Sequence, residues 1–120
     1  MGKKILVIDD NLQDQKIIQH HLSQGGFQDV VFATDGEEGI GKVESEKPDL
    51  IIVDVLMPKM DGYTFVKSLR KQQLEKQTPV IVLTGREETK DLFELEGITD
   101  YITKPYEPKH LLEKVGACLG

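Results

Sequence analysis

The stretch "KILVIDD", residues 4–10, joins a run of aliphatic and β-branched residues directly to two adjacent carboxylates. Similar apolar runs recur along the chain as "DVVFA" (29–33), "DLIIVDV" (49–55), "PVIVL" (79–83) and "DYIT" (100–103). These runs do not alternate cleanly between apolar and polar residues, which is typical of strands buried on both faces. The sequence therefore predicts five strands inside a sheet that is covered on both sides.

Amphipathic stretches separate the apolar runs and carry apolar residues near helical spacing. The predicted helices cover residues 11–24, 36–46, 62–75, 86–96 and 107–118. Strict alternation of strands and helices implies a parallel sheet with helices on both faces. A chain of 120 residues suits an open doubly wound sheet and is too short for an eight-stranded barrel. We expect an α/β fold with a single domain, residues 1–120.

The first predicted helix has the clearest pattern. Its apolar residues are Leu12, Ile17, Ile18 and Leu22, which lie near the spacing of one helical face. Gly25 and Gly26 follow and are expected to end it.

Composition narrows the range of partners. The chain carries 21 acidic and 15 basic residues, a net charge of -6, with 38% hydrophobic and 30% charged residues. This balance indicates a globular protein whose acidic surface would repel nucleic-acid backbones and anionic membranes. Cys118 is the single cysteine, so no internal disulfide can form. The first apolar run stops at Asp9, too short for a signal peptide, and none approaches the roughly 20 residues of a membrane span. A cytoplasmic location is expected.

Polar residues follow the predicted strands at the point where each one ends. Asp9 and Asp10 follow the first strand, Asp54 lies near the end of the third, Thr84 follows the fourth and Lys104 follows the fifth. The carboxyl ends of parallel strands meet at one edge of the sheet, where open α/β sheets bind their ligands. We therefore expect these side chains to form one site.

Three carboxylates at that edge would repel one another. Two unit charges ~5 Å apart at an effective dielectric constant of ~20 interact by roughly 3 kcal/mol. Lys104 supplies one positive charge, which does not balance three acids. All the candidate ligands are oxygen atoms, and this favours Mg²⁺ or Mn²⁺ over Zn²⁺.

Taken together, these motifs resemble the receiver domain of two-component response regulators, of the kind found in chemotaxis regulators. The resemblance rests on "DD" after the first strand, "VDVLMPKMDG" around the end of the third, "VLTG" and "YITKPY". It extends over essentially the whole chain. It implies a flavodoxin-like sheet with the strand order 2-1-3-4-5.

The resemblance also implies a metal site. Asp9, Asp10 and Asp54 would hold Mg²⁺, or Mn²⁺, together with the backbone carbonyl of Leu56. Asp10 would be the direct ligand, and Asp9 would act largely through water.

The same resemblance assigns the phosphoryl chemistry. Asp54 would accept a phosphoryl group from the phosphohistidine of a sensor histidine kinase or a histidine phosphotransfer protein. Lys104, before a cis Lys104–Pro105 bond, would pair with one phosphoryl oxygen, and the Thr84 hydroxyl would bind another. Thr84 and Tyr101 would then switch the output face formed by helix 86–96, strand 100–103 and helix 107–118. A downstream protein or a fused output domain would read that face, without direct binding of nucleic acid or membrane by this domain.

Other interpretations of these residues remain open. The Asp9–Asp10 pair could cap the first helix, and Tyr101 could be an ordinary half-buried aromatic residue. The whole chain could be an interaction module that works without phosphorylation. An aspartate-based phosphatase would need a second acid at position 56, where this chain has Leu56. A flavin site would need a phosphate-binding loop in place of the acidic "DDNLQD". We therefore expect a protein that supports its own phosphorylation and dephosphorylation and is not a turnover enzyme.

Overall fold

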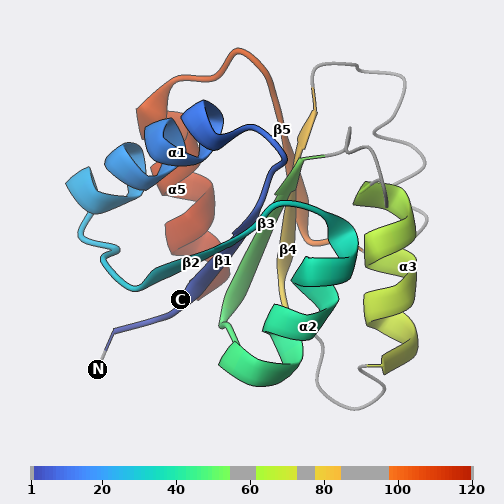
Figure 1. Ribbon diagram of the computed structural model, residues 1–120. Coiled ribbons are helices and arrows are strands. Elements are labelled where there is room, and N and C mark those ends of the chain that lie inside the picture. The colour runs from blue at the N-terminus through green and yellow to red at the C-terminus, as the bar shows by residue number, and fades with distance from the viewer. Residues whose placement is uncertain (1, 55–61, 73–77, 85–97, 120) are drawn as a thin grey trace.

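The computed structural model describes residues 2–54, 62–72, 78–84 and 98–119. The elements in chain order are β1 (Ile5–Ile8), α1 (Leu12–Gln24), β2 (Val30–Ala33), α2 (Gly36–Glu46), β3 (Leu50–Asp54), α3 (Gly62–Gln72), β4 (Val80–Thr84), β5 (Asp100–Thr103) and α5 (Pro108–Leu119) (Figure 1). The helix predicted at 86–96 lies outside the described residues. Within the described ranges, no helix combines the length and apolar character needed to cross a membrane.

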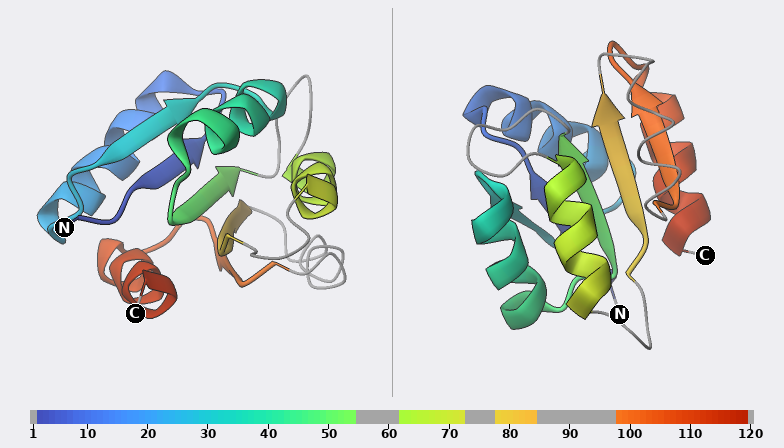
Figure 2. Two further views of the ribbon diagram at one scale, coloured as in Figure 1. Left: turned by 90° about the horizontal axis from the view of Figure 1, so that it is seen from below. Right: turned by 90° about the vertical axis from the view of Figure 1, so that its right-hand side faces the viewer.

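The five strands form one parallel sheet with the order β2-β1-β3-β4-β5, which confirms the predicted fold class. Helices α1 and α5 cover one face of the sheet, and α2 and α3 cover the other (Figure 2). The chain passes from β1 outward to β2 and then back across β1 to β3. The strand order thus reverses beside β1, and the carboxyl ends of β1 and β3 flank the position where such sheets bind ligands.

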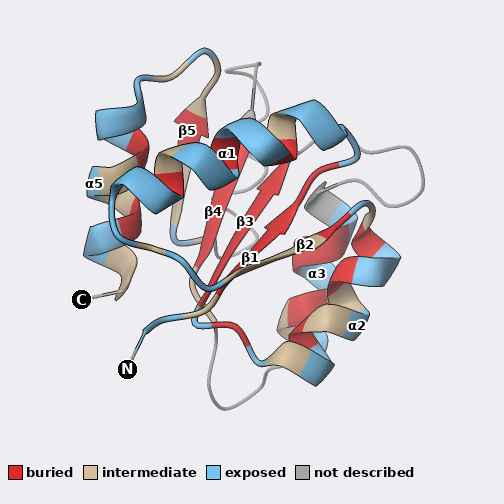
Figure 3. Cartoon of the chain, turned by 60° about the vertical axis from the view of Figure 1, so that its left-hand side comes forward, coloured by how far each residue is buried: buried red, intermediate tan, exposed pale blue. Residues whose placement is uncertain are grey.

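The central strands are buried on both faces because each face is covered by helices. Every residue of β1 and the apolar residues of β3 have no exposed surface, whereas the edge strands β2 and β5 are mostly half-buried (Figure 3). One cluster of buried side chains joins the sheet to α2 and α3, including Phe65. The other joins it to α1 and α5, including Leu22 and Leu111. This arrangement explains the lack of alternation in the sequence.

The first helix differs from its predicted pattern. Ile18 and Leu22 are buried, but Leu12 and Ile17 are 63% and 51% exposed. Gln15 takes the place next to Ile18 in the buried stripe, and it is only 7% exposed. Only two of the four apolar residues are therefore buried, and the polar Gln15 completes the buried face of the helix.

Caps define both ends of α1. The side chain of Asn11 accepts hydrogen bonds from the backbone N–H groups of Gln13 and Asp14, so neither Asp9 nor Asp10 is the N-cap. The helix ends at Gly25, as predicted, and Gly26 follows with a φ of 90°. The two acids of the opening motif are therefore not used to cap the helix.

Candidate functional site

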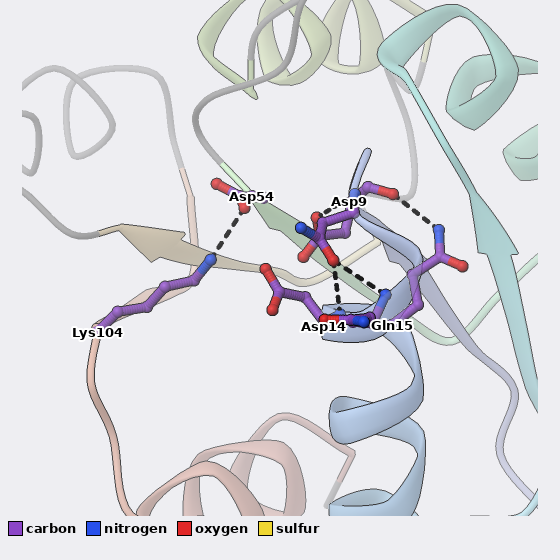
Figure 4. A network of polar contacts seen from close by, with 7 residues as sticks. Asp9, Asp14, Gln15, Asp54 and Lys104 are labelled. Atoms are coloured by element: carbon purple, nitrogen blue, oxygen red, sulfur yellow. Dashed lines mark hydrogen bonds and ion pairs between the residues drawn. The ribbon is translucent and has the colours of Figure 1, made fainter.

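The candidate site lies where the carboxyl ends of β1, β3 and β5 meet. Asp9 directly follows β1, Asp54 is the last residue of β3, and Lys104 directly follows β5. Parallel pairing holds β1 beside β3 with Ile8 opposite Val53. The next residue along the chain is an aspartate in both cases, Asp9 and Asp54. Figure 4 shows these side chains turned toward a common space. The structure thus brings together three of the predicted site residues from distant parts of the chain.

An ion pair links Asp54 to Lys104. The Lys104 Nζ donates a hydrogen bond of 2.9 Å to Oδ2 of Asp54. Burial by itself would lower the pKa of Lys104, but the hydrogen bond to Asp54 and the charges of Asp54 and Asp9 outweigh burial and raise it. Lys104 is therefore a fixed positive charge at neutral pH.

Asp9 is the most deeply buried of the acids, with 1% of its surface exposed. Its Oδ1 accepts a 2.9 Å hydrogen bond from the backbone N–H of Asn11. Its Oδ2 is buried and has no hydrogen-bond partner in the described part of the chain. Burial raises the pKa of Asp9 to about 6, helped by the charges of Asp54 and Asp14 and opposed by the Asn11 bond and Lys104.

A third carboxylate, which the sequence pattern did not identify, completes the cluster. Asp14, in the first turn of α1, offers a carboxylate oxygen that lies with those of Asp9 and Asp54 within 4.8 Å of one another. Asp10 is exposed and does not belong to this cluster. The sequence signal that could have identified Asp14 is its position in the first turn of the helix that follows β1, because such a turn lies close to the carboxyl end of the strand.

Gln15 holds the end of β1 against the end of β2. Its Nε2 donates hydrogen bonds of 2.7 Å to the carbonyl oxygen of Asp9 and 3.2 Å to that of Ala33. This buried amide fixes the backbone that carries Asp9. The sequence signal for it was a glutamine within the buried stripe of an amphipathic helix.

The remaining predicted residues are placed as follows. Thr84 is the last residue of β4, opposite Thr103 in β5, and its side chain lies outside the described residues. Tyr101 is half-buried, packs against the core on the α2–α3 side, and lines a groove of about 470 Å³ between β5 and α5. Leu56 lies outside the described residues. The Lys104–Pro105 peptide bond is cis, as expected.

The charges of the described cluster suit a hard divalent cation. Three carboxylates and one lysine carry three negative charges and one positive charge, so the formal net charge of the cluster is −2, which one divalent cation would balance. Oxygen donors without nitrogen or sulfur match the preferences of Mg²⁺ and Mn²⁺. The unpartnered Oδ2 of Asp9 supports this fit, because a buried carboxylate oxygen ordinarily has a partner. The residues present therefore fit a magnesium site better than a zinc site.

Comparison with known protein families identifies the chain. The family model for the response regulator receiver domain matches residues 5–116. The chain belongs to this family of two-component receiver domains, which are not turnover enzymes. Its acidic cluster at the sheet edge is typical of a phosphoacceptor site.

Individual relatives agree with this assignment. The chain is 45% identical to the alkaline phosphatase synthesis transcriptional regulatory protein PhoP of Bacillus subtilis over 99% of its own length, but over only 49% of that protein. It thus spans about half the length of the curated relatives it matches. The chemotaxis response regulator CheY4 of Vibrio cholerae is 35% identical with a TM-score of 0.89, covering 99% of this chain and 100% of that one.

A third relative bears on the cation. The receiver domain of a sensor histidine kinase from Pseudomonas aeruginosa is 27% identical, with a TM-score of 0.89 over 100% of this chain and 99% of that one. That structure has a magnesium ion coordinated in its active-site cleft.

Proposed function

We propose that Asp54 is the phosphoacceptor of this receiver domain. Its carboxylate oxygen attacks the phosphorus of a phosphohistidine, and the phosphorus–nitrogen bond breaks as an aspartyl phosphate forms. The observation that carries this proposal is the 2.9 Å ion pair between Asp54 and Lys104 at the reversal point of the sheet. With only 9% of its surface exposed, Asp54 opens to solvent through a small area, which suits attack from one direction.

Asp9, Asp10 and Asp54 would hold Mg²⁺ together with the backbone carbonyl of Leu56, as the family resemblance implies, with Asp10 as the direct ligand and Asp9 acting largely through water. When bound, Mg²⁺ supplies positive charge that offsets the charge developing on the phosphoryl oxygens. Mn²⁺ would serve in the same position. The magnesium-containing receiver domain of the Pseudomonas aeruginosa kinase supports this assignment.

Lys104 and Thr84 act on the transferred group. The ammonium of Lys104 lies within hydrogen-bond distance of Asp54, so a small movement brings it to a phosphoryl oxygen. The Thr84 hydroxyl, at the end of the adjacent strand, binds a second oxygen. Tyr101 then repacks against the core, and the groove between β5 and α5 that it lines changes shape.

The phosphoryl donor is a protein, either a sensor histidine kinase or a histidine phosphotransfer protein, acting in the cytoplasm. A groove of about 390 Å³ lies between α1 and the segment after β5. Ile17 and Lys104 both line it, and Ile17 is half exposed. A helix that presents its histidine to Asp54 would cover this apolar surface. The altered β5–α5 face then acts on a downstream protein or on an output domain fused to the receiver.

Incubation with acetyl phosphate and Mg²⁺, followed by intact-mass measurement, tests the proposal. We expect one phosphoryl group on the wild-type protein, none on Asp54→Ala, and none when EDTA replaces Mg²⁺. Asp49→Ala is the matched control, because Asp49 precedes the same strand at the opposite edge of the sheet and should leave phosphorylation unchanged. An unmodified wild-type protein would instead favour an interaction module that works without phosphorylation.

A further inference from the structure

Asp14 occupies a position that the family resemblance did not assign. It is the third residue of α1, half-buried, and its carboxylate accepts no hydrogen bond within the described ranges. The Oδ1 of Asn11, the N-cap, accepts a hydrogen bond from the backbone N–H of Asp14, and this bond fixes the first turn of the helix. Figure 4 shows the Asp14 side chain directed from α1 toward the space between Asp54 and Lys104. The acid is thus held at the site by a capped helix.

A second observation points to a ligand at the same place. Asp9 is 1% exposed, and its Oδ2 has no hydrogen-bond partner in the described part of the chain. Desolvating a carboxylate oxygen without a partner is unfavourable. Lys104 does not supply that partner, because its Nζ donates to Oδ2 of Asp54 and no hydrogen bond from the described residues reaches Oδ2 of Asp9. A cation among Asp9, Asp14 and Asp54 would satisfy the buried oxygen and offset the remaining negative charge.

We propose that Asp14 is an additional carboxylate of the cation site, which contacts the divalent cation directly or through one bound water and raises the affinity of the unphosphorylated domain for it. The inference rests on the proposed function, since it concerns the same cation. Additional ligand charge strengthens binding of hard divalent cations. Residues that act on such a site through a bound water contribute strongly as well.

A purely structural role for Asp14 would have a different signature. An acid in the first turn of a helix stabilises it through the helix dipole. Glu37 has the same kind of position in the first turn of α2, but it is exposed and lies outside the cluster. Replacing either acid by its amide removes the dipole interaction, whereas only the Asp14 change removes a charge from the cation site.

Titration with Mn²⁺ at neutral pH, with free Mn²⁺ counted by electron paramagnetic resonance, tests the inference without phosphorylation. We expect Asp14→Asn to weaken binding on the order of tenfold. Asp14→Glu, which keeps the charge, should restore part of the affinity, and Glu37→Gln should bind as the wild type does. Thermal unfolding in EDTA checks that each variant is folded.

Two outcomes would overturn this inference without contradicting the proposed function. One is wild-type affinity in Asp14→Asn, and the other is equal weakening in Glu37→Gln. A wild-type protein that does not bind Mn²⁺ would instead contradict the cation site of the proposed function, and this inference with it.

Discussion

Lys104 Nζ lies 2.9 Å from Oδ2 of Asp54, although fifty positions separate the two residues in the chain. The loop after β5 delivers the ammonium to the end of β3, across the intervening strand β4. The pair therefore depends on the complete sheet order and not on local sequence. In the proposed function, this ammonium would offset the charge that develops on the oxygens of a transferred phosphoryl group.

Replacing Lys104 with Met should slow phosphorylation of Asp54 by acetyl phosphate about 10²-fold, because the variant lacks the fixed charge beside the acceptor. The initial rate of mass gain at a fixed Mg²⁺ concentration measures this effect. Lys114→Met is the matched control. Lys114 forms an ion pair of the same 2.9 Å length with Asp100 and is similarly exposed. Equal rates in the two variants would show that Lys104 has no special role.

The stability of the cation-free domain should fall as pH rises from about 4 to about 7. The pKa of Asp9 is raised from its ordinary 3.8 to about 6 in the folded protein, chiefly by burial. Between those values the folded state binds more protons than the unfolded state, so the stabilising proton is lost as pH passes 6. The change amounts to about 3 kcal/mol for this group.

Asp9→Asn isolates this contribution, because an amide does not titrate and still accepts the Asn11 hydrogen bond through its oxygen. In EDTA, we compare the free energy of unfolding of the variant with that of the wild type at each pH. This difference should shift in favour of the variant by up to about 3 kcal/mol between pH 4 and pH 7. Urea unfolding at both pH values gives the difference. Added Mg²⁺ should stabilise the wild type more than the variant. Parallel pH curves for the two proteins would contradict the assigned burial of Asp9.

The sheet was predictable from the sequence because burial on both faces requires continuous apolar strands. The predicted run at residues 49–55 agrees with β3 at Leu50–Asp54, and the run at 100–103 agrees with β5 residue for residue. The convergence of Asp9, Asp54 and Lys104 followed from the same logic, since strand ends must meet at one edge. The strand order came from the family resemblance and is confirmed.

The contributions of α1 to the site were not predictable in the same way. Which helical side chains face the strand end depends on where the helix begins, and Asn11 begins it one residue after Asp10. That start turns Asp14 and Gln15 toward the site. An apolar pattern alone favoured Leu12 and Ile17 for burial, and both are exposed. Rotation of a helix about its own axis is set by caps and buried polar contacts as well as by apolar spacing.

Replacing Gln15 with Ala should destabilise the domain by about 1–3 kcal/mol, since the carbonyl oxygen of Asp9 loses its side-chain donor in a buried place. The comparison is Gln19→Ala on the exposed face of the same helix, which should change stability by no more than about 0.5 kcal/mol. Urea unfolding in EDTA measures both. The Gln15 variant should also bind Mn²⁺ more weakly, because the backbone carrying Asp9 is no longer held. Stability equal to that of the Gln19 variant would refute a positioning role.

Two glycines of α2 should respond in opposite ways to the same substitution. A Cβ on Gly39 would lie 2.5 Å from Cδ1 of Ile8 and 3.1 Å from Cε1 of Phe65, both fully buried, whereas a Cβ on Gly41 would meet nothing within 4 Å. Gly41→Ala should therefore stabilise the domain by up to about 1 kcal/mol through helix propensity. Gly39→Ala should destabilise it by about 1–3 kcal/mol, because the core must shift to accept the methyl group.

Ile8 directly precedes Asp9, so the Gly39 variant should also lose affinity for Mn²⁺ while the Gly41 variant keeps it. Equal stabilisation by both substitutions, measured by urea unfolding, would show that α2 packs less closely on β1 than these distances require.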